Sequence, residues 1–369
     1  MSRFLFSLAE EEEDDAALRR RMSQDIMQGN ISVSFRREPS YFIGSRVQGE
    51  QVQVIKCEER SSGRIVGMGA RMMLPAWING STQHLGYLAD LRGDPAYRGS
   101  TLLARGYRFL RQLHEDDPVP LYYSLILDGN RLALDNLTRA RGGLPKYRDM
   151  GRMLTPAIHL DLPRRKVRET GISVETGKHS RLQSIFDFIN RQYGRKQFSP
   201  CYLSGQLGTA RLAGLKAEDF LVAVKGNAIV GVIAAWDQRA FRQTCVEQYS
   251  LALKSLRPLY NLASKLTPLK ALPAPGRAVP YFYLAFCAVE HDDPAVFRML
   301  LSHLYGQRRK GSWHYFIAGL HERNPLAQVL KEYRQIPAAG HLFAVHYPED
   351  EAHYLALDER VPHIEIGAV

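Results

Sequence analysis

The sequence has few cysteines, and their spacing excludes the common disulfide and zinc frameworks. The four are Cys57, Cys201, Cys245 and Cys287. None belongs to a Cys-x-x-Cys pair, and none lies at zinc-site spacing from a histidine. The histidines of the C-terminal region, His341 among them, also lack the spacing of a metal site on one helix face. We therefore expect free thiols, no metal centre and a cytoplasmic location.

Long hydrophobic runs are also missing. The longest runs, Ala228–Trp236 and Tyr281–Val289, have the length of a strand, whereas a membrane helix needs ~20 apolar residues. The N-terminal residues MSRFLFSLAEEEEDD lack the basic start and extended apolar core of a secretory signal. From these two absences we expect no membrane partner.

Several catalytic motifs are missing as well. The chain has no Gly-x-Ser-x-Gly elbow and no Gly-Lys-Ser/Thr phosphate loop. A lone Gly67-x-Gly69 lies within a strand pattern and lacks the helix that a dinucleotide loop requires. The net charge of +11 comes from basic residues spread along the chain. A solvated surface is the favoured explanation of this excess, and a functional basic patch is the alternative. A nucleic-acid partner would rest on charge alone and ranks last among the hypotheses.

The order of predicted elements repeats about half-way along the chain, whose length of 369 residues suits two domains. In each half, a hairpin pattern precedes an apolar strand, and a turn and a helix follow that strand. The two apolar strands are Leu85–Leu91 and Tyr281–Val289, and their helices begin near Leu102 and Ala295. This order favours a tandem repeat of one α/β unit.

A polar, basic segment that contains a proline, residues 161–170, separates the two repeats and has the composition of a linker. We therefore predict one domain at residues 1–160 and a second at residues 171–369. Each is expected to end with its own closing strand, Tyr147–Leu160 in the first and His341–His346 in the second.

The stretch His84–Leu113 combines features that suit a diphosphate group. Its apolar strand ends at a turn with glycine and proline, and Tyr97-Arg98-Gly99-Ser100-Thr101 then precedes a helical pattern of leucines. The first N–H groups of a helix have no partner inside the helix, and its dipole places positive charge there. Arg98 adds a further positive charge, so this turn is predicted to bind phosphate.

This stretch resembles the acyl-CoA binding motif of the GNAT superfamily of N-acyltransferases. Many members read roughly D-L-x-V-x-P-x-Y-R-G-x-G-x-G/A, and the matching residues here are Asp90, Leu91, Pro95, Tyr97, Arg98 and Gly99. Thr101 and Leu103 stand where the family has small residues. A second resemblance, to the family's Asn-x-x-Ala, lies at Asn130–Ala133, at the start of a predicted helix Arg131–Arg141.

The resemblance implies both a fold and a site. The implied fold class is α/β (α+β): two tandem GNAT-like domains, each a mixed, mostly antiparallel twisted sheet flanked by helices. The implied acyl-CoA site consists of Leu91, Arg92, Gly93, Arg98, Gly99, Ser100, Thr101, Leu102, Leu103 and Asn130. Asp90 is the candidate base, and the alternative is that its carboxylate only binds the backbone or Arg98. The family's frequent general acid, a tyrosine, would fall at Leu137, so that acid is missing, supplied from elsewhere or replaced by water.

The implied activity is direct transfer of an acetyl or other acyl group from acyl-CoA to an amine, with no metal. The acceptor, the acyl length and the choice between monomer and homodimer stay open. The second repeat has Asp292 and Asp293 at the phosphate position, so we expect it not to bind CoA there. The alternative is a GNAT-like protein that has lost catalysis and binds acyl-CoA or acts as a scaffold, which Leu137, Thr101 and Leu103 favour.

Overall fold

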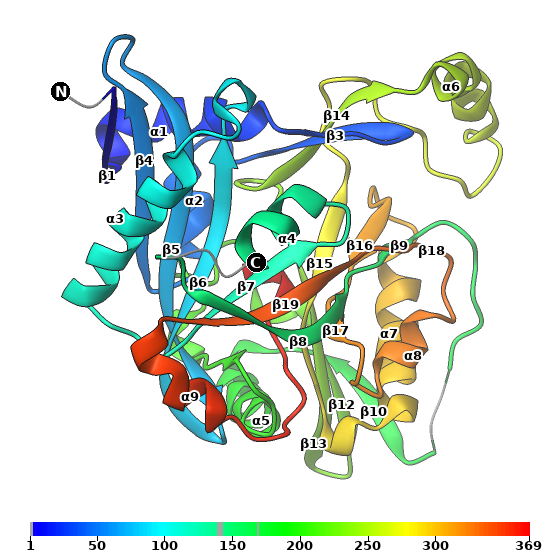
Figure 1. Ribbon diagram of the computed structural model, residues 1–369. Helices are drawn as coiled ribbons and strands as arrows, with labels where there is room; N and C mark the ends of the chain where they lie inside the picture. The colour runs from blue at the N-terminus through cyan, green and yellow to red at the C-terminus, as the bar shows by residue number, and fades with distance from the viewer. Residues whose placement is uncertain (1–2, 139–142, 168–169) are drawn as a thin grey trace.

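The computed structural model describes residues 3–138, 143–167 and 170–369, and two twisted sheets form its body (Figure 1). The first sheet contains, in spatial order, β1 (Phe4–Leu8), β4 (Gln51–Glu59), β5 (Arg64–Ile78), β6 (Ser81–Gly93), β7 (Tyr122–Leu127), β19 (Ala339–His346), β8 (Lys146–Leu154) and β17 (Leu320–His321), with β11 (Ser199–Pro200) on β5. The second contains β10 (Ile172–Thr176), β12 (Phe220–Lys225), β13 (Ala228–Trp236), β15 (Tyr281–Val289), β16 (Tyr315–Ile317), β9 (Ala157–His159) and β18 (Gln335–Ile336).

A small third sheet forms an arm beside the body. It consists of β14 (Gln243–Tyr249), β3 (Ile31–Arg36) and β2 (Ile26–Met27). None of these strands was predicted from the sequence, although Ile31, Val33 and Phe35 alternate with serines in β3. The arm joins segments from the two halves of the chain, because β3 pairs with β14 over residues that lie some two hundred positions apart, such as Ser34 and Cys245.

Helices cover the two large sheets and pack on them through apolar faces, apart from α6, which contacts β14 of the third sheet. They are α1 (Glu11–Ser23), α2 (Tyr41–Arg46), α3 (Leu102–Asp116), α4 (Arg131–Thr138), α5 (Leu182–Tyr193), α6 (Leu251–Ala263), α7 (Pro294–Arg308), α8 (Ala327–Leu330) and α9 (Glu351–Leu355). In α3, for example, Tyr107, Leu110 and Leu113 are buried at helical spacing. Of the helices described, none is long and apolar enough to cross a bilayer.

Both large sheets have the predicted mixed, mostly antiparallel character. The named strands pair in parallel only at β6–β7 in the first sheet and at β15–β16 in the second. The hairpins before them, β4–β5 and β12–β13, are antiparallel as predicted. The α/β (α+β) class is therefore confirmed. The predicted helix end at residues 139–141 and part of the predicted linker, residues 168–169, lie outside the described residues.

The repeat extends to backbone detail. In β6 the register against β5 shifts next to Asp90, which has a φ of 53°. In β15 the register against β13 shifts next to Phe286, which has a φ of 55°. A bulge of this kind bends a strand and redirects the chain beyond it. Each bulged strand then leads through a 3-10 turn, η1 (Pro95–Tyr97) or η5 (Glu290–Asp292), into a long helix.

The closing strands differ from the prediction, because the two halves exchange them. Residues 147–160 form two strands: β8 stays in the first sheet, whereas β9 pairs with β16 and β18 in the second. Pro156 separates them and has no N–H to continue a ladder. In return, β19 lies between β7 and β8 of the first sheet. Each large sheet therefore contains a strand from the other half of the chain. The domain boundary at residues 161–170 stays a prediction about where one repeat ends and the next begins along the sequence.

Candidate functional site

The site predicted from the motif lies where two central strands part. Among the described residues, β6 and β7 pair only at Gly86–Tyr122 and Tyr87–Tyr123. The Ser124 hydroxyl then donates to the Leu88 carbonyl oxygen at 3.0 Å, and it is the last link across the pair. Beyond it, β6 follows β5 and β7 follows β19. Main-chain polar groups along the parted edges therefore need partners other than a neighbouring strand.

The loop after β6 is exposed, and a hydrogen bond of Asp94 fixes the turn that precedes it. Arg98, Gly99, Ser100 and Thr101 are all exposed, and Gly99 has a φ of 76°. A Cβ atom built on Gly99 would meet nothing within 4 Å, so the space beside the loop is open. The Asp94 carboxylate accepts from the Ala96 N–H at 2.9 Å and fixes the start of η1. The loop thus presents its surface at the N-terminus of α3, as the motif predicted.

Tyr97 attaches this loop to the edge of the sheet. Its hydroxyl donates to Glu59 Oε1 at 2.9 Å, and its ring packs edge-on against Phe4. Arg3 donates to the same Glu59 carboxylate at 2.8 Å, and these hydrogen bonds lower the pKa of Glu59 to about 2. A motif tyrosine therefore serves here as an anchor, which positions Arg98 and Gly99 without needing to contact a ligand itself.

The Asp90 carboxylate lies just after the point where the strands part, and it is ion-paired. It accepts from the Tyr41 hydroxyl at 2.7 Å and lies 2.8 Å from the Arg37 guanidinium. Burial by itself would raise the pKa of Asp90, but the charges of Arg37 and Arg92 and the Tyr41 hydrogen bond outweigh burial and lower it. Asp90 is therefore ionised at neutral pH, and its charge is largely balanced by Arg37.

The remaining predicted site residues occupy varied surroundings. Leu91 and Gly93 are exposed, and Arg92 donates to Asp25 at 3.1 Å. Leu102 is half-buried, and Leu103 packs against the apolar cluster under α3.

At the second motif match, the side-chain oxygen of Asn130 accepts from the Ala133 N–H at 3.1 Å and caps α4. Leu137, at the position of the family's tyrosine, is buried in the apolar cluster under α3 and α4.

In the second repeat, the chain's own side chains occupy the corresponding positions. The Glu365 carboxylate accepts from the Phe286 main-chain N–H at 2.9 Å, directly at the bulge. The carboxylate of Asp292 pairs with Lys196, and that of Asp293 caps α7 by accepting from the Ala295 N–H at 2.8 Å. These contacts leave the first repeat as the one with an open loop at the end of its bulged strand.

Glu365→Gln should remove a pH-dependent loss of stability. Burial raises the pKa of Glu365 from 4.5 to about 7 despite the hydrogen bonds that it accepts. Its stabilising contribution is thus complete below the unfolded-state pKa and is lost as the pH rises through the folded-state pKa. The wild-type protein should lose roughly 3 kcal/mol between about pH 4.5 and 8 relative to the variant.

Thermal unfolding of both proteins across this pH range provides the measurement. Glu359→Gln is the matched control, because Glu359 is exposed six positions earlier in the same segment. Parallel pH profiles for the wild type and Glu365→Gln would contradict the prediction.

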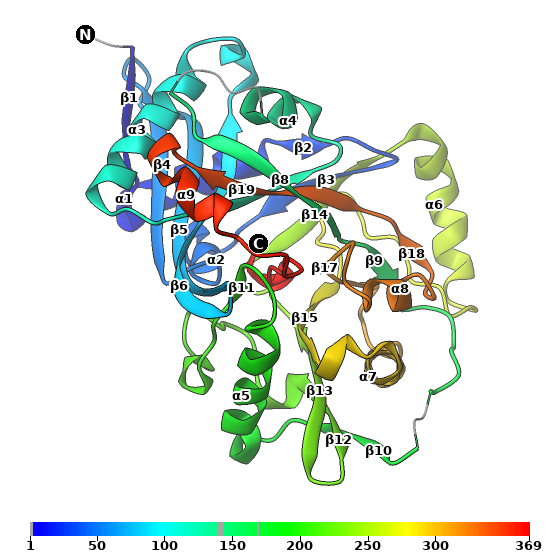
Figure 2. The ribbon, with the colours of Figure 1, turned by 60° about the horizontal axis from the view of Figure 1, so that its bottom comes forward.

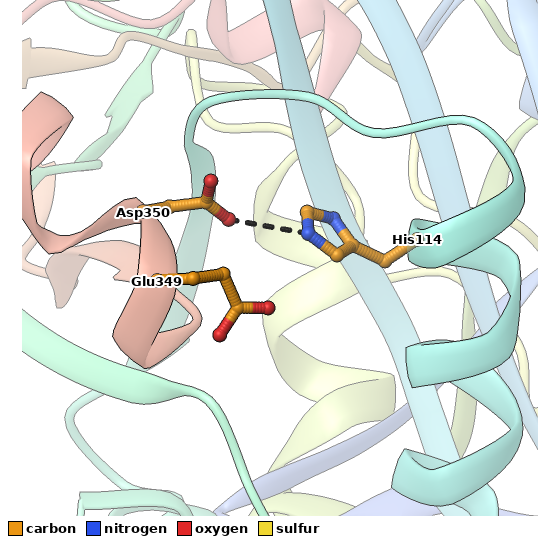
Figure 3. Close-up of side chains that lie close together, drawn as sticks. All are labelled: His114, Glu349 and Asp350. Atoms are coloured by element: carbon orange, nitrogen blue, oxygen red, sulfur yellow. Dashed lines mark ion pairs between the residues drawn. The ribbon is translucent and has the colours of Figure 1, made fainter.

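A second cluster of titratable groups joins α3 to the C-terminal segment (Figure 3). His114, Glu349 and Asp350 place one possible ligand atom each within 4.8 Å of one another. His114 Nε2 lies 3.1 Å from Asp350, and its Nδ1 lies 2.9 Å from the Tyr122 hydroxyl. Glu349 pairs with Arg111 at 2.6 Å. Burial lowers the pKa of His114, and the opposing effect of the Asp350 charge offsets only part of that lowering. These contacts account for the three side chains as a structural link between α3 and the C-terminal segment.

Sequence reasoning missed the groups that surround Asp90. Arg37 is buried and also donates to Gln48 at 2.8 Å, and Arg242 contributes a positive charge that lowers the Asp90 pKa. Arg242 also donates to the Gly367 carbonyl oxygen at 2.9 Å, so the end of the chain lies close by. The fold brings Arg37 and Tyr41 to Asp90, and no local sequence pattern indicates that they belong to the site.

The sequence matches no protein-family profile and no curated protein. Solved structures, in contrast, align over nearly the whole chain. The glucosamine N-acetyltransferase region of a fungal multi-domain β-N-acetylglucosaminidase aligns with a TM-score of 0.61 and 13% identity, over 92% of this chain and 38% of that one. The chain therefore spans less than half of that protein's length. This chain has the fold of the GCN5-related N-acetyltransferases.

Two further structures support the GNAT fold. Saccharomyces cerevisiae N-myristoyltransferase with bound myristoyl-CoA aligns with a TM-score of 0.60 and 9% identity, over 94% of this chain and 80% of that one. A GCN5-related N-acetyltransferase from Sphaerobacter thermophilus aligns with a TM-score of 0.54 and 12% identity, over 93% and 96%. The resemblance drawn from the motif is thus confirmed at the level of the fold.

Proposed function

We propose that the protein is an acyltransferase that moves an acetyl or other acyl group from acyl-CoA directly to an amine. The observation that carries the proposal is the parting of β6 and β7 beside the exposed loop Arg98–Thr101 at the start of α3. The parted strands offer main-chain groups to an extended ligand, and the loop offers N–H groups and a cation to its phosphates. The two halves of one CoA-like molecule would thus find complementary surfaces.

Each group of side chains has a role in this proposal. Arg98, Gly99, Ser100 and Thr101 hold the diphosphate, and the neighbouring predicted residues from Leu91 to Leu103, together with Asn130, line the rest of the site. A main-chain N–H of the parted β6 edge polarises the thioester carbonyl. Asp90 accepts the proton of the attacking amine, directly or through water. Leu137 is buried, so the leaving thiolate takes its proton from solvent or from another group.

Release of free CoA tests the proposal. The purified protein is incubated with acetyl-CoA and, separately, with myristoyl-CoA, because the aligned proteins carry these two acyl classes in their names. The acceptors are glucosamine, simple alkyl amines and short peptides with a free N-terminus. We expect amine-dependent thiol release with at least one pair, detected with a thiol reagent, and an acylated amine of the matching mass. An absence of product with every pair would contradict acyl transfer to this class of acceptors.

One observation favours a second candidate, an acyl-CoA binding protein without catalysis. Leu137 and Leu103 both belong to the apolar cluster under α3, in positions where active family members have a tyrosine and a small residue. The same purified protein separates the two candidates. Calorimetric binding of CoA without thiol release supports the binding protein, whereas binding with amine-dependent release supports the enzyme.

A further inference from the structure

Helix α6 carries its apolar side toward solvent. Leu251, Leu256, Leu259 and Leu262 are 85%, 56%, 66% and 59% exposed, and Leu266, just after the helix, is 89% exposed. No residue of α6 is buried. The helix stands at the end of the arm formed by β3 and β14 in Figure 1, and Figure 2 shows it at the edge of the molecule.

The side of α6 that carries Arg257 and Asn261 faces the protein, so the exposed leucines lie on the outside. The Arg257 side chain donates to the Leu272 carbonyl oxygen at 3.3 Å, and Asn261 makes two hydrogen bonds with the Leu272 main chain, at 3.1 and 2.8 Å. The half-buried residues Leu253, Arg257, Asn261 and Ser264 share one face at helical spacing, and the exposed leucines Leu251, Leu259 and Leu262 lie opposite. Turning the leucines inward would break these hydrogen bonds.

The arm holds the helix in this orientation at both ends. The Ser250 N–H donates to the Asn30 carbonyl oxygen at 2.9 Å, so the β2–β3 turn supports the start of the helix. After the helix, Lys270 donates to the carbonyl oxygens of Arg309 and Gly311 at 2.9 and 2.8 Å and ties the returning segment to the body. The apolar face is therefore formed before any partner arrives, and a partner need not pay for its folding.

The charge of this segment selects among possible partners. Residues 248–289 contain five basic residues and no aspartate or glutamate. Lys254 and Lys265 are exposed, and helical spacing places both along one flank of the leucine face. A second copy docked on the same face would bring lysines together without a carboxylate to balance them. An anionic lipid surface offers both negative charge and an apolar phase.

We propose that α6 binds the surface of a bilayer that contains anionic lipid, with its leucines among the acyl chains and its lysines at the headgroups. The arm then places the body of the protein at the membrane surface. This proposal rests on the exposed leucines and the charge of α6, and it does not depend on acyl transfer. It revises the expectation of no membrane partner, which was based on the absence of a spanning segment.

Vesicle flotation of the full chain tests the proposal, with vesicles of phosphatidylcholine alone and of phosphatidylcholine mixed with phosphatidylglycerol. The wild type should bind the anionic vesicles at least about tenfold more tightly than the neutral ones, and Lys254→Glu/Lys265→Glu should remove that preference. Leu259→Ser/Leu262→Ser should weaken binding by about a hundredfold. The matched control is Leu203→Ser/Leu355→Ser, which changes two leucines that are 63% and 72% exposed on other parts of the surface.

Light scattering after gel filtration identifies the competing occupant. A wild-type dimer that becomes a monomer in Leu259→Ser/Leu262→Ser, without flotation, would show that a second copy covers the helix and would overturn the proposal. A wild type that neither floats nor self-associates would overturn it as well, as would flotation that both leucine pairs reduce equally. All variants should keep the wild-type melting temperature, because the four leucines face solvent.

Discussion

The Arg98→Glu variant should lose about a hundredfold in affinity for CoA while keeping its fold. The substitution removes a charge-assisted hydrogen bond of about 2 kcal/mol and adds repulsion of about 1 kcal/mol between the new carboxylate and a diphosphate. Arg98 is exposed, and the loop geometry depends on Asp94 and Tyr97 instead. The melting temperature should therefore change little. Calorimetry with CoA gives the affinity, and the loss should shrink as salt screens the exposed charges.

Arg108→Glu is the matched control for this experiment. Arg108 is exposed on α3, roughly two turns beyond its start, and the substitution changes the net charge by the same amount. It should leave CoA affinity within about twofold, since its charge is farther from the loop. Equal losses in the two variants would mean that overall charge, and not this loop, attracts CoA. An unchanged affinity in Arg98→Glu would reject the phosphate assignment.

The fold could be predicted from the motif because the motif consists of consecutive local elements with a recognisable turn between them. An apolar strand, a Tyr97-Arg98-Gly99 turn and a leucine-rich helix follow one another within a single segment, and local patterns of this kind survive in the structure. The exchange of β9 and β19 could not be predicted in this way. Apolar periodicity shows that His341–His346 is a strand, but it does not say which of two sheets contains it, because both offer apolar surfaces of the same kind.

The site could be predicted only as far as the motif extends. The turn Arg98–Thr101 was predicted from the sequence as a binding site, whereas the partners of Asp90 come from α2 and the segment before it, some fifty residues away. The sequence alone does not distinguish a buried arginine such as Arg37 from a surface arginine. Only the fold shows that Arg37 is desolvated and needs a carboxylate. For the same reason, the outward-facing leucines of α6 became evident only from the structure.

The Asp90→Asn variant should lose both stability and turnover. Arg37 has only 2% of its side chain exposed, and it would keep its charge without the carboxylate that lies 2.8 Å away. Breaking one partner of a buried ion pair costs about 3 kcal/mol or more, so the melting temperature should fall by several degrees. The double variant Arg37→Gln/Asp90→Asn leaves no uncompensated charge and should recover most of this stability, which thermal unfolding of the three proteins measures.

Turnover then separates a proton acceptor from a mere counter-ion. If Asp90 takes the proton of the amine, both Asp90→Asn and the double variant should lose about a hundredfold or more in kcat, with KM for acyl-CoA nearly unchanged. The positive charge of Arg37 helps to hold the Asp90 pKa below its ordinary range, so wild-type kcat/KM should show no loss from this carboxylate between about pH 5 and 7. Recovery of full turnover together with stability in the double variant would show that Asp90 only balances Arg37 and that the base is another group at the parted strands.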